Sequence, residues 1–189
     1  MKFIDKINDV NFRVQVLIFS FFFIYVSFQY VFSGISLNND DVIQIQSISK
    51  DGYTFLTAGR WGLYIIFEYF QQNNPGGDFV GFLGILLLFL GSIFSLKIIN
   101  LRSNIALLLF LTLSCVSIYY GFTFDFSSSW LAYPLGNFLI LSGLYIAVSR
   151  NLPLGIVVMS VAPALYPATI ELACTTLICA SIADLVRDR

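Results

Sequence analysis

The residues best suited to chemistry are a carboxylate pair and an arginine in one polar stretch of an otherwise apolar chain. Asp40 and Asp41 are adjacent, and Arg60 follows in the sequence Gly59-Arg60-Trp61. Two adjacent carboxylates near a region of low dielectric constant can have raised pKa values, which suits a general base or a cation ligand. The alternative is an acidic cap at the start of a helix, where the helix dipole favours negative charge.

Arg60 also allows two interpretations. An arginine at the membrane surface can bind a phosphate group through two parallel hydrogen bonds. Gly59 would then allow a ligand or a neighbouring helix to approach closely, and Trp61 could stack on a sugar ring. Alternatively, Arg60 extends from an interfacial helix toward water, and Trp61 anchors that helix at the membrane surface.

Asp125 and Glu171 are two further carboxylates in apolar surroundings. Asp125 lies among aromatic residues in the sequence YYGFTFDFSSSW, where it could hydrogen-bond sugar hydroxyls or cap the helix that follows. Glu171 lies near the start of the last apolar segment, close to Pro163 and Pro167. A carboxylate inside a membrane is a functional candidate. Glu171 could instead pair with a polar group near the proline break, or be solvated at the surface.

The composition around these residues is that of a multi-pass membrane protein. The chain has 189 residues, of which 58% are hydrophobic and 11% are charged, whereas about 25% of a soluble domain is charged. It has no histidine, and its three cysteines form no CxxC pair, so the usual zinc and haem sites are not expected. We predict no organic cofactor, and a divalent cation at Asp40 and Asp41 stays an open alternative.

Apolar segments of spanning length position the candidate residues. A helix needs about 20 residues to cross the hydrocarbon core of a bilayer. We therefore expect an all-α membrane helix bundle that forms a single transmembrane module over residues 1–189. Its predicted spans are 14–34, 79–99, 105–122, 130–148 and 168–186.

Two shorter helices are expected beside the spans. A short helix over 154–166 precedes the last span, because Pro163 and Pro167 interrupt that apolar stretch. The loop over 35–78 is expected to hold an amphipathic helix over 54–70, which lies in the membrane interface.

The basic residues predict the orientation of the chain, because cytoplasmic loops carry an excess of lysine and arginine. With a cytoplasmic N-terminus, Lys50 and Arg60 are the only basic residues outside. The eight inside are Lys2, Lys6, Arg13, Lys97, Arg102, Arg150, Arg187 and Arg189. We therefore expect both termini in the cytoplasm, and Asp40, Asp41 and Asp125 on the outer side.

Four elements in this order resemble the type II O-antigen glucosyltransferases of bacteria and their phages, and the wider GT-C class of membrane glycosyltransferases. They are the acidic pair after the first span, GRW at 59–61, the aromatic-Asp hairpin at 122–150 and ALYPATIELACTTLI at 164–178. The last element reads Tyr166-Pro167-Ala168 where the family tends to carry tyrosine-glutamine-alanine. Members of the family are usually more than twice as long, so the resemblance is to their N-terminal half.

The resemblance implies an inverting glucosyltransferase of the bacterial inner membrane with its site facing the periplasm. Its donor would be undecaprenyl-phosphate glucose, and its acceptor would be O-antigen on a lipid carrier. Asp40 or Asp41 would be the catalytic base. Arg60 is our candidate for stabilising the leaving phosphate, and the candidate substrate-binding residues are Arg60, Trp61, Asp125 and Glu171. The implied protein partners are a flippase, a donor synthase or a chain that supplies a C-terminal half, and no nucleic acid is expected.

Other functions remain compatible with the sequence. The chain could be a non-catalytic subunit or a flippase-like protein of the same pathway, or an inactive remnant of the enzyme. A transporter that uses Glu171 beside a broken helix is a further alternative.

Overall fold

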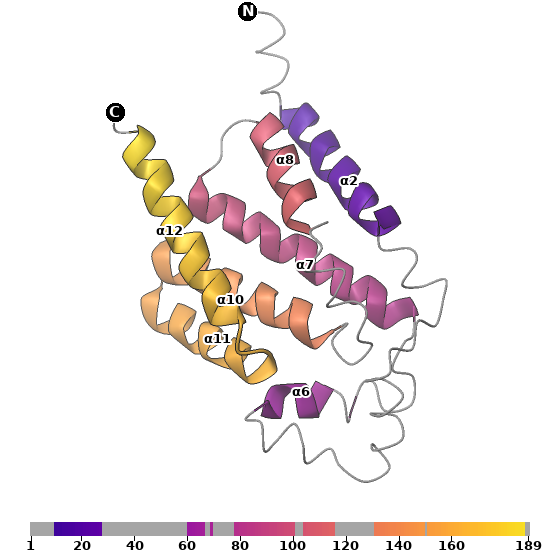
Figure 1. The fold of residues 1–189 in the computed structure, drawn as a ribbon, viewed down its shortest axis with the longest axis vertical. Helices are drawn as coiled ribbons and strands as arrows, with labels where there is room; N and C mark the ends of the chain where they lie inside the picture. Colours follow the sequence, from indigo (N-terminus) through magenta and orange to yellow (C-terminus); the bar gives the residue numbers. More distant parts are fainter. Residues whose placement is uncertain are drawn as a thin grey trace, which may run out of the picture.

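The chain folds as a bundle of apolar helices. The computed structural model (Figure 1) describes residues 10–27, 60–66, 69, 78–100, 104–115, 131–149 and 151–187. Over these residues it contains helices and no strand, which confirms the predicted all-α class. The helices are α2 (Val10–Ser27), α6 (Trp61–Ile66), α7 (Asp78–Ile99), α8 (Asn104–Cys115), α10 (Ala132–Ser149), α11 (Leu152–Leu165) and α12 (Thr169–Arg187).

Three of the described helices are long and apolar enough to cross a membrane. The spanning segments are Phe79–Ile99 in α7, Ala132–Ser149 in α10 and Thr169–Val186 in α12. Their ends lie within about two residues of the predicted spans, which is the usual uncertainty of helix boundaries. The chain is therefore a polytopic membrane protein.

The other predicted spans are covered in part. Apolar helices α2 and α8 begin shortly before the predicted spans 14–34 and 105–122 and cover their first parts. The remainder of both spans lies outside the described residues, so the arrangement of five spans stays a prediction.

The two predicted short helices also have counterparts. α11 matches the helix expected over 154–166, and Asn151 caps it by accepting a hydrogen bond from the Leu154 amide at 3.0 Å. Pro163 lies in its last turn, and the helix ends at Leu165. α6 lies within the helix expected over 54–70, most of which falls outside the described residues.

α7 packs against two groups of helices. With α2 and α8 it forms a core of large aliphatic side chains, in which Ile24, Ile85 and Leu111 are fully buried. On its other side it packs against α10, where Gly91 faces the backbone of Phe138. α7 is therefore the central element of the bundle.

Small and polar residues join the remaining helices. Gly155 of α11 lies against Ala147 of α10, where an added Cβ would be 2.5 Å from the Ala147 Cβ. Ser95 and Thr176 share a hydrogen bond of 3.4 Å between α7 and α12. Such contacts are typical of membrane helices, because lipid chains give no hydrophobic driving force for helix association.

The two ends of the bundle carry different basic residues. In Figure 1 the start of α2, the start of α8 and the end of α12 lie at the top, whereas α6 and the junction between α11 and α12 lie at the bottom. Arg13 and Lys97 line one cavity at the first end. Arg60, which precedes α6, lies at the opposite end.

Candidate functional site

Arg60 lies immediately before α6 and faces the end of α11. Its guanidinium carbon Cζ is 5.4 Å from the centroid of the Tyr166 ring, within the distance of about 6 Å at which an aromatic face attracts a cation. Arg60 is half-buried, and its carbonyl oxygen accepts a hydrogen bond from the Tyr64 amide at 3.1 Å. The structure therefore joins two elements, GRW and the Tyr166 segment, that are far apart in the sequence.

An ordered turn between α11 and α12 holds Tyr166 in place. Tyr166 has extended backbone angles, φ −152° and ψ 115°, as expected for a residue that precedes a proline. The amide and the hydroxyl of Thr169 donate hydrogen bonds to the Tyr166 carbonyl oxygen at 3.1 and 2.8 Å. Because Thr169 is fully buried, this turn is anchored in the bundle rather than attached to its surface.

A glycine brings α6 against α11. A Cβ added at Gly62 would lie 2.9 Å from Leu165 Cδ2 and 3.1 Å from the backbone of Ala164. A larger residue at this position would push α6, and with it Arg60, away from Tyr166. The close approach predicted from the sequence is at Gly59, which lies outside the described residues. Gly62 was missed, although it belongs to the same short segment.

Tyr133 packs against the ring of Tyr166. The two rings pack edge to face, with centroids 4.9 Å apart and an interplanar angle of 88°. Tyr133 is buried near the start of α10. Sequence reasoning did not single out Tyr133, since one tyrosine among many aromatic residues carries no distinct signal.

Asn137 is a buried polar residue one helical turn after Tyr133. Residues four apart lie on the same helix face. Its side chain is 1% exposed, and within the described part of the chain neither Oδ1 nor Nδ2 has a hydrogen-bond partner. An unsatisfied buried amide costs about 1–3 kcal/mol. Asn137 therefore offers a donor and an acceptor to a polar group. An asparagine inside an apolar span is the sequence feature that could have indicated this residue.

Trp61 and Glu171 lie on the surface of this end of the bundle. Trp61 is the first residue of α6, and nearly half of its side chain is exposed. Glu171 is exposed in the first turn of α12, where the helix dipole favours a negative charge. No ion pair joins Glu171 to Arg60 in the described structure, so the two charges remain separate groups.

Three predicted site residues lie outside the described residues. Asp40, Asp41 and Asp125 therefore keep the roles that the sequence predicts for them, without a structural position. Within the described ranges, no group of three or more His, Cys, Asp or Glu side chains could hold a metal ion.

The arrangement at this end combines a guanidinium with aromatic rings. A guanidinium can bind phosphate oxygens in pairs, and aromatic faces stack on sugars, whose C–H bonds are apolar. Comparison with protein families gives a match to the family described as glucosyl transferase GtrII, over residues 29–188. The chain belongs to this family.

Membership of the GtrII family implies a glucosyltransferase role in O-antigen modification. It also confirms the resemblance on which the sequence analysis relied. The matched region includes Arg60, Tyr133, Asn137 and Tyr166, and thus the whole cluster described above. Comparison with curated proteins and with solved structures gives no match.

Proposed function

We propose that this GtrII-family chain transfers glucose from undecaprenyl-phosphate glucose to O-antigen on its lipid carrier, at the periplasmic face of the bacterial inner membrane. The observation that carries this proposal is the position of Arg60 over the ring of Tyr166. A lipid-linked donor brings its phosphate to the membrane surface. A half-buried arginine at one end of a helix bundle is suited to receive the phosphate there.

Arg60 would stabilise the leaving group. As the bond between the anomeric carbon and the phosphate oxygen breaks, negative charge develops on the phosphate. A cation fixed in advance lowers the energy of that transition state more than a mobile one, because it does not need to reorganise. The contact with the Tyr166 ring restricts the guanidinium, and a cation–π contact leaves N–H donors available for paired hydrogen bonds.

Asp40 or Asp41 would act as the base. The carboxylate accepts the proton of the acceptor hydroxyl, the hydroxyl oxygen attacks the anomeric carbon, and undecaprenyl phosphate leaves with the bonding electron pair. Attack from the side opposite to the leaving group inverts the anomeric configuration, as in GT-C enzymes. A base so positioned contributes about 10²–10⁴-fold to a rate.

The remaining candidates would hold the sugar and the acceptor. Trp61 presents an exposed aromatic surface beside Arg60, which suits stacking on glucose. Asp125 and Glu171 would accept hydrogen bonds from sugar hydroxyls. Asn137 would bind a polar group that reaches into the apolar bundle, since its amide is buried without a partner in the described structure.

A complementation experiment tests the proposal. The chain is expressed in a host that makes undecaprenyl-phosphate glucose and a defined O-antigen, and added glucose is measured by mass spectrometry. Asp40→Asn/Asp41→Asn and Arg60→Ala are compared with the parent chain at matched membrane levels, and a host without the donor synthase is the control.

We expect transfer by the parent, dependence on the donor synthase, and a loss of at least about a hundredfold in each variant. If a stable, inserted parent chain transfers no glucose, the proposal of a catalytic chain is wrong. A non-catalytic subunit or an inactive remnant would then describe it better.

A further inference from the structure

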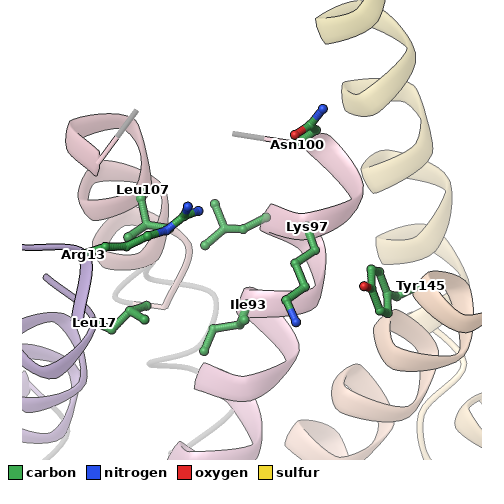
Figure 2. Close-up of a pocket in the computed structure, with 8 residues that line it drawn as sticks. Arg13, Leu17, Ile93, Lys97, Asn100, Leu107 and Tyr145 are labelled. Carbon is green, nitrogen blue, oxygen red and sulfur yellow. The ribbon is translucent and has the colours of Figure 1, made fainter. Parts of the chain in front are cut away.

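A basic cavity lies at the end of the bundle opposite to Arg60. Its volume is about 450 Å³, and it is bordered by α2, α7, α8 and α10. Figure 2 shows the lining residues, with Arg13 coming from α2 and Lys97 from α7. Among the described residues that form the lining, Arg13 and Lys97 are the charged ones, and none is a carboxylate.

Two aromatic rings hold the ammonium of Lys97 at this cavity. Its Nζ lies 5.3 Å from the ring centroid of Tyr145 and 5.7 Å from that of Phe94. Cation–π contacts restrict a flexible lysine but leave its N–H donors available. Lys97 is thus a positioned cation, not only a charge at a helix end.

The rest of the cavity has one polar and one apolar part. Asn100, which directly follows α7, contributes a polar residue, and its positive φ of 58° turns the chain away from the helix. Leu17, Ile93 and Leu107 form an apolar wall. A ligand that fits both parts has an anionic head and an apolar tail.

We propose that this cavity binds the phosphate of an anionic glycerophospholipid, with an acyl chain along Leu17 and Ile93. The guanidinium of Arg13 and the ammonium of Lys97 pair with the phosphate oxygens. The loop charges predict that this end faces the cytoplasm, where the membrane leaflet is rich in anionic lipid. This proposal does not rest on glucosyl transfer, because the cavity and the Arg60 cluster lie at opposite ends.

The test measures the lipid preference of the purified chain in detergent. The midpoint of thermal unfolding is followed while phosphatidylglycerol, phosphatidylcholine or inorganic phosphate is added. The parent is compared with Arg13→Gln/Lys97→Gln and with Arg13→Lys/Lys97→Arg, which keeps both charges. Lys2→Gln/Lys6→Gln removes the same charge from the sequence that precedes α2.

We expect phosphatidylglycerol to raise the midpoint of the parent more than phosphatidylcholine does. The apparent affinity for phosphatidylglycerol is expected to fall about tenfold in Arg13→Gln/Lys97→Gln and to persist in both other variants. Because the two lipids are compared within each variant, a lower starting stability does not obscure the result. The single variants Arg13→Gln and Lys97→Gln are expected to have apparent affinities for phosphatidylglycerol between those of the parent and of Arg13→Gln/Lys97→Gln.

Two results would overturn the proposal. One is a parent that responds equally to both lipids, or a phosphatidylglycerol preference that survives in Arg13→Gln/Lys97→Gln. The other is a shift produced by inorganic phosphate alone and lost in the same variant, which would assign the cavity to a free phosphate.

Discussion

The guanidinium of Arg60 lies over the ring of Tyr166, with Cζ 5.4 Å from the ring centroid. Arg60 precedes α6, and Tyr166 directly follows α11, so the contact depends on how these two short helices pack. Gly62 permits that packing, and Thr169 fixes the turn that directs Tyr166. The position of the arginine is therefore a property of the fold and not of the loop alone.

Replacing Tyr166 tests whether its ring matters for glucose transfer. Tyr166→Ala removes the face under Arg60 and the edge-to-face contact with Tyr133. Together these contacts contribute about 1–2 kcal/mol, so we expect transfer to fall about tenfold. Tyr166→Phe keeps both contacts and is expected to retain activity. Equal transfer by all three chains in the mass-spectrometric assay would show that the ring does not position Arg60.

The hydroxyl of Thr169 is expected to stabilise the turn at Tyr166. Thr169→Val keeps the shape of the side chain but removes the 2.8 Å hydrogen bond to the Tyr166 carbonyl. The expected loss is about 1 kcal/mol in the free energy of unfolding, measured by thermal unfolding in detergent. Thr112→Val is the control, because the Thr112 hydroxyl bonds to carbonyl groups of its own helix α8. Similar midpoints for both variants would count against this role of Thr169.

The side chain of Asn137 is expected to lower the stability of the fold and to contribute to glucose transfer. Asn137→Leu replaces an unpartnered buried amide by an apolar group of similar size, and is expected to raise the free energy of unfolding by about 1–3 kcal/mol. We also expect it to reduce glucose transfer, because unsatisfied polar groups in a core tend to be kept for function.

Ser20→Ala is the matched control for Asn137→Leu. Ser20 Oγ is also buried without a hydrogen-bond partner in the described structure, but it lies in α2, away from the Arg60 cluster. This variant is expected to gain stability and to keep full transfer. Asn137→Leu with parental transfer would remove Asn137 from the proposed site.

Two Gly→Ala variants compare the packing of α10 with its neighbours. A Cβ at Gly155 would lie 2.5 Å from the Ala147 Cβ and backbone, whereas a Cβ at Gly91 would lie 3.4 Å from the nearest atoms of Phe138. We expect Gly155→Ala to lower the free energy of unfolding by about 1–3 kcal/mol, because overpacking is destabilising. Gly91→Ala has the same gain in helix propensity as Gly155→Ala, and we expect it to leave the free energy of unfolding unchanged or to raise it. Equal effects of the two variants would contradict this close approach of α10 and α11.

Three membrane-crossing helices could be predicted from the sequence, because apolar length is a local signal. Phe79–Ile99, Ala132–Ser149 and Thr169–Val186 are apolar over about the thickness of a bilayer, and the proline pair marks the short helix before the last of them. These signals are local in the chain. They say which segments are helices, but they do not say which helix faces which.

The contacts between residues of the candidate site could not be predicted, because local signals do not show which helices pack together. Arg60 was recognised by its charge, yet its contact with Tyr166 depends on the close approach at Gly62, which has no local signal. Tyr133 looks like any membrane tyrosine until its ring is seen against Tyr166. The roles of Asp40, Asp41 and Asp125 stay predictions.

The most direct measurement is the binding of undecaprenyl-phosphate glucose to the purified chain in nanodiscs. The parent is compared with Arg60→Gln, which removes the charge, and Arg60→Lys, which keeps the charge without the paired donors. We predict that the affinity falls by about tenfold or more in Arg60→Gln, because a charge-assisted contact with the donor phosphate is lost. An intermediate affinity is predicted for Arg60→Lys. Equal affinities of the parent and Arg60→Gln would contradict the account, because Arg60 would then not be the group that binds the donor phosphate.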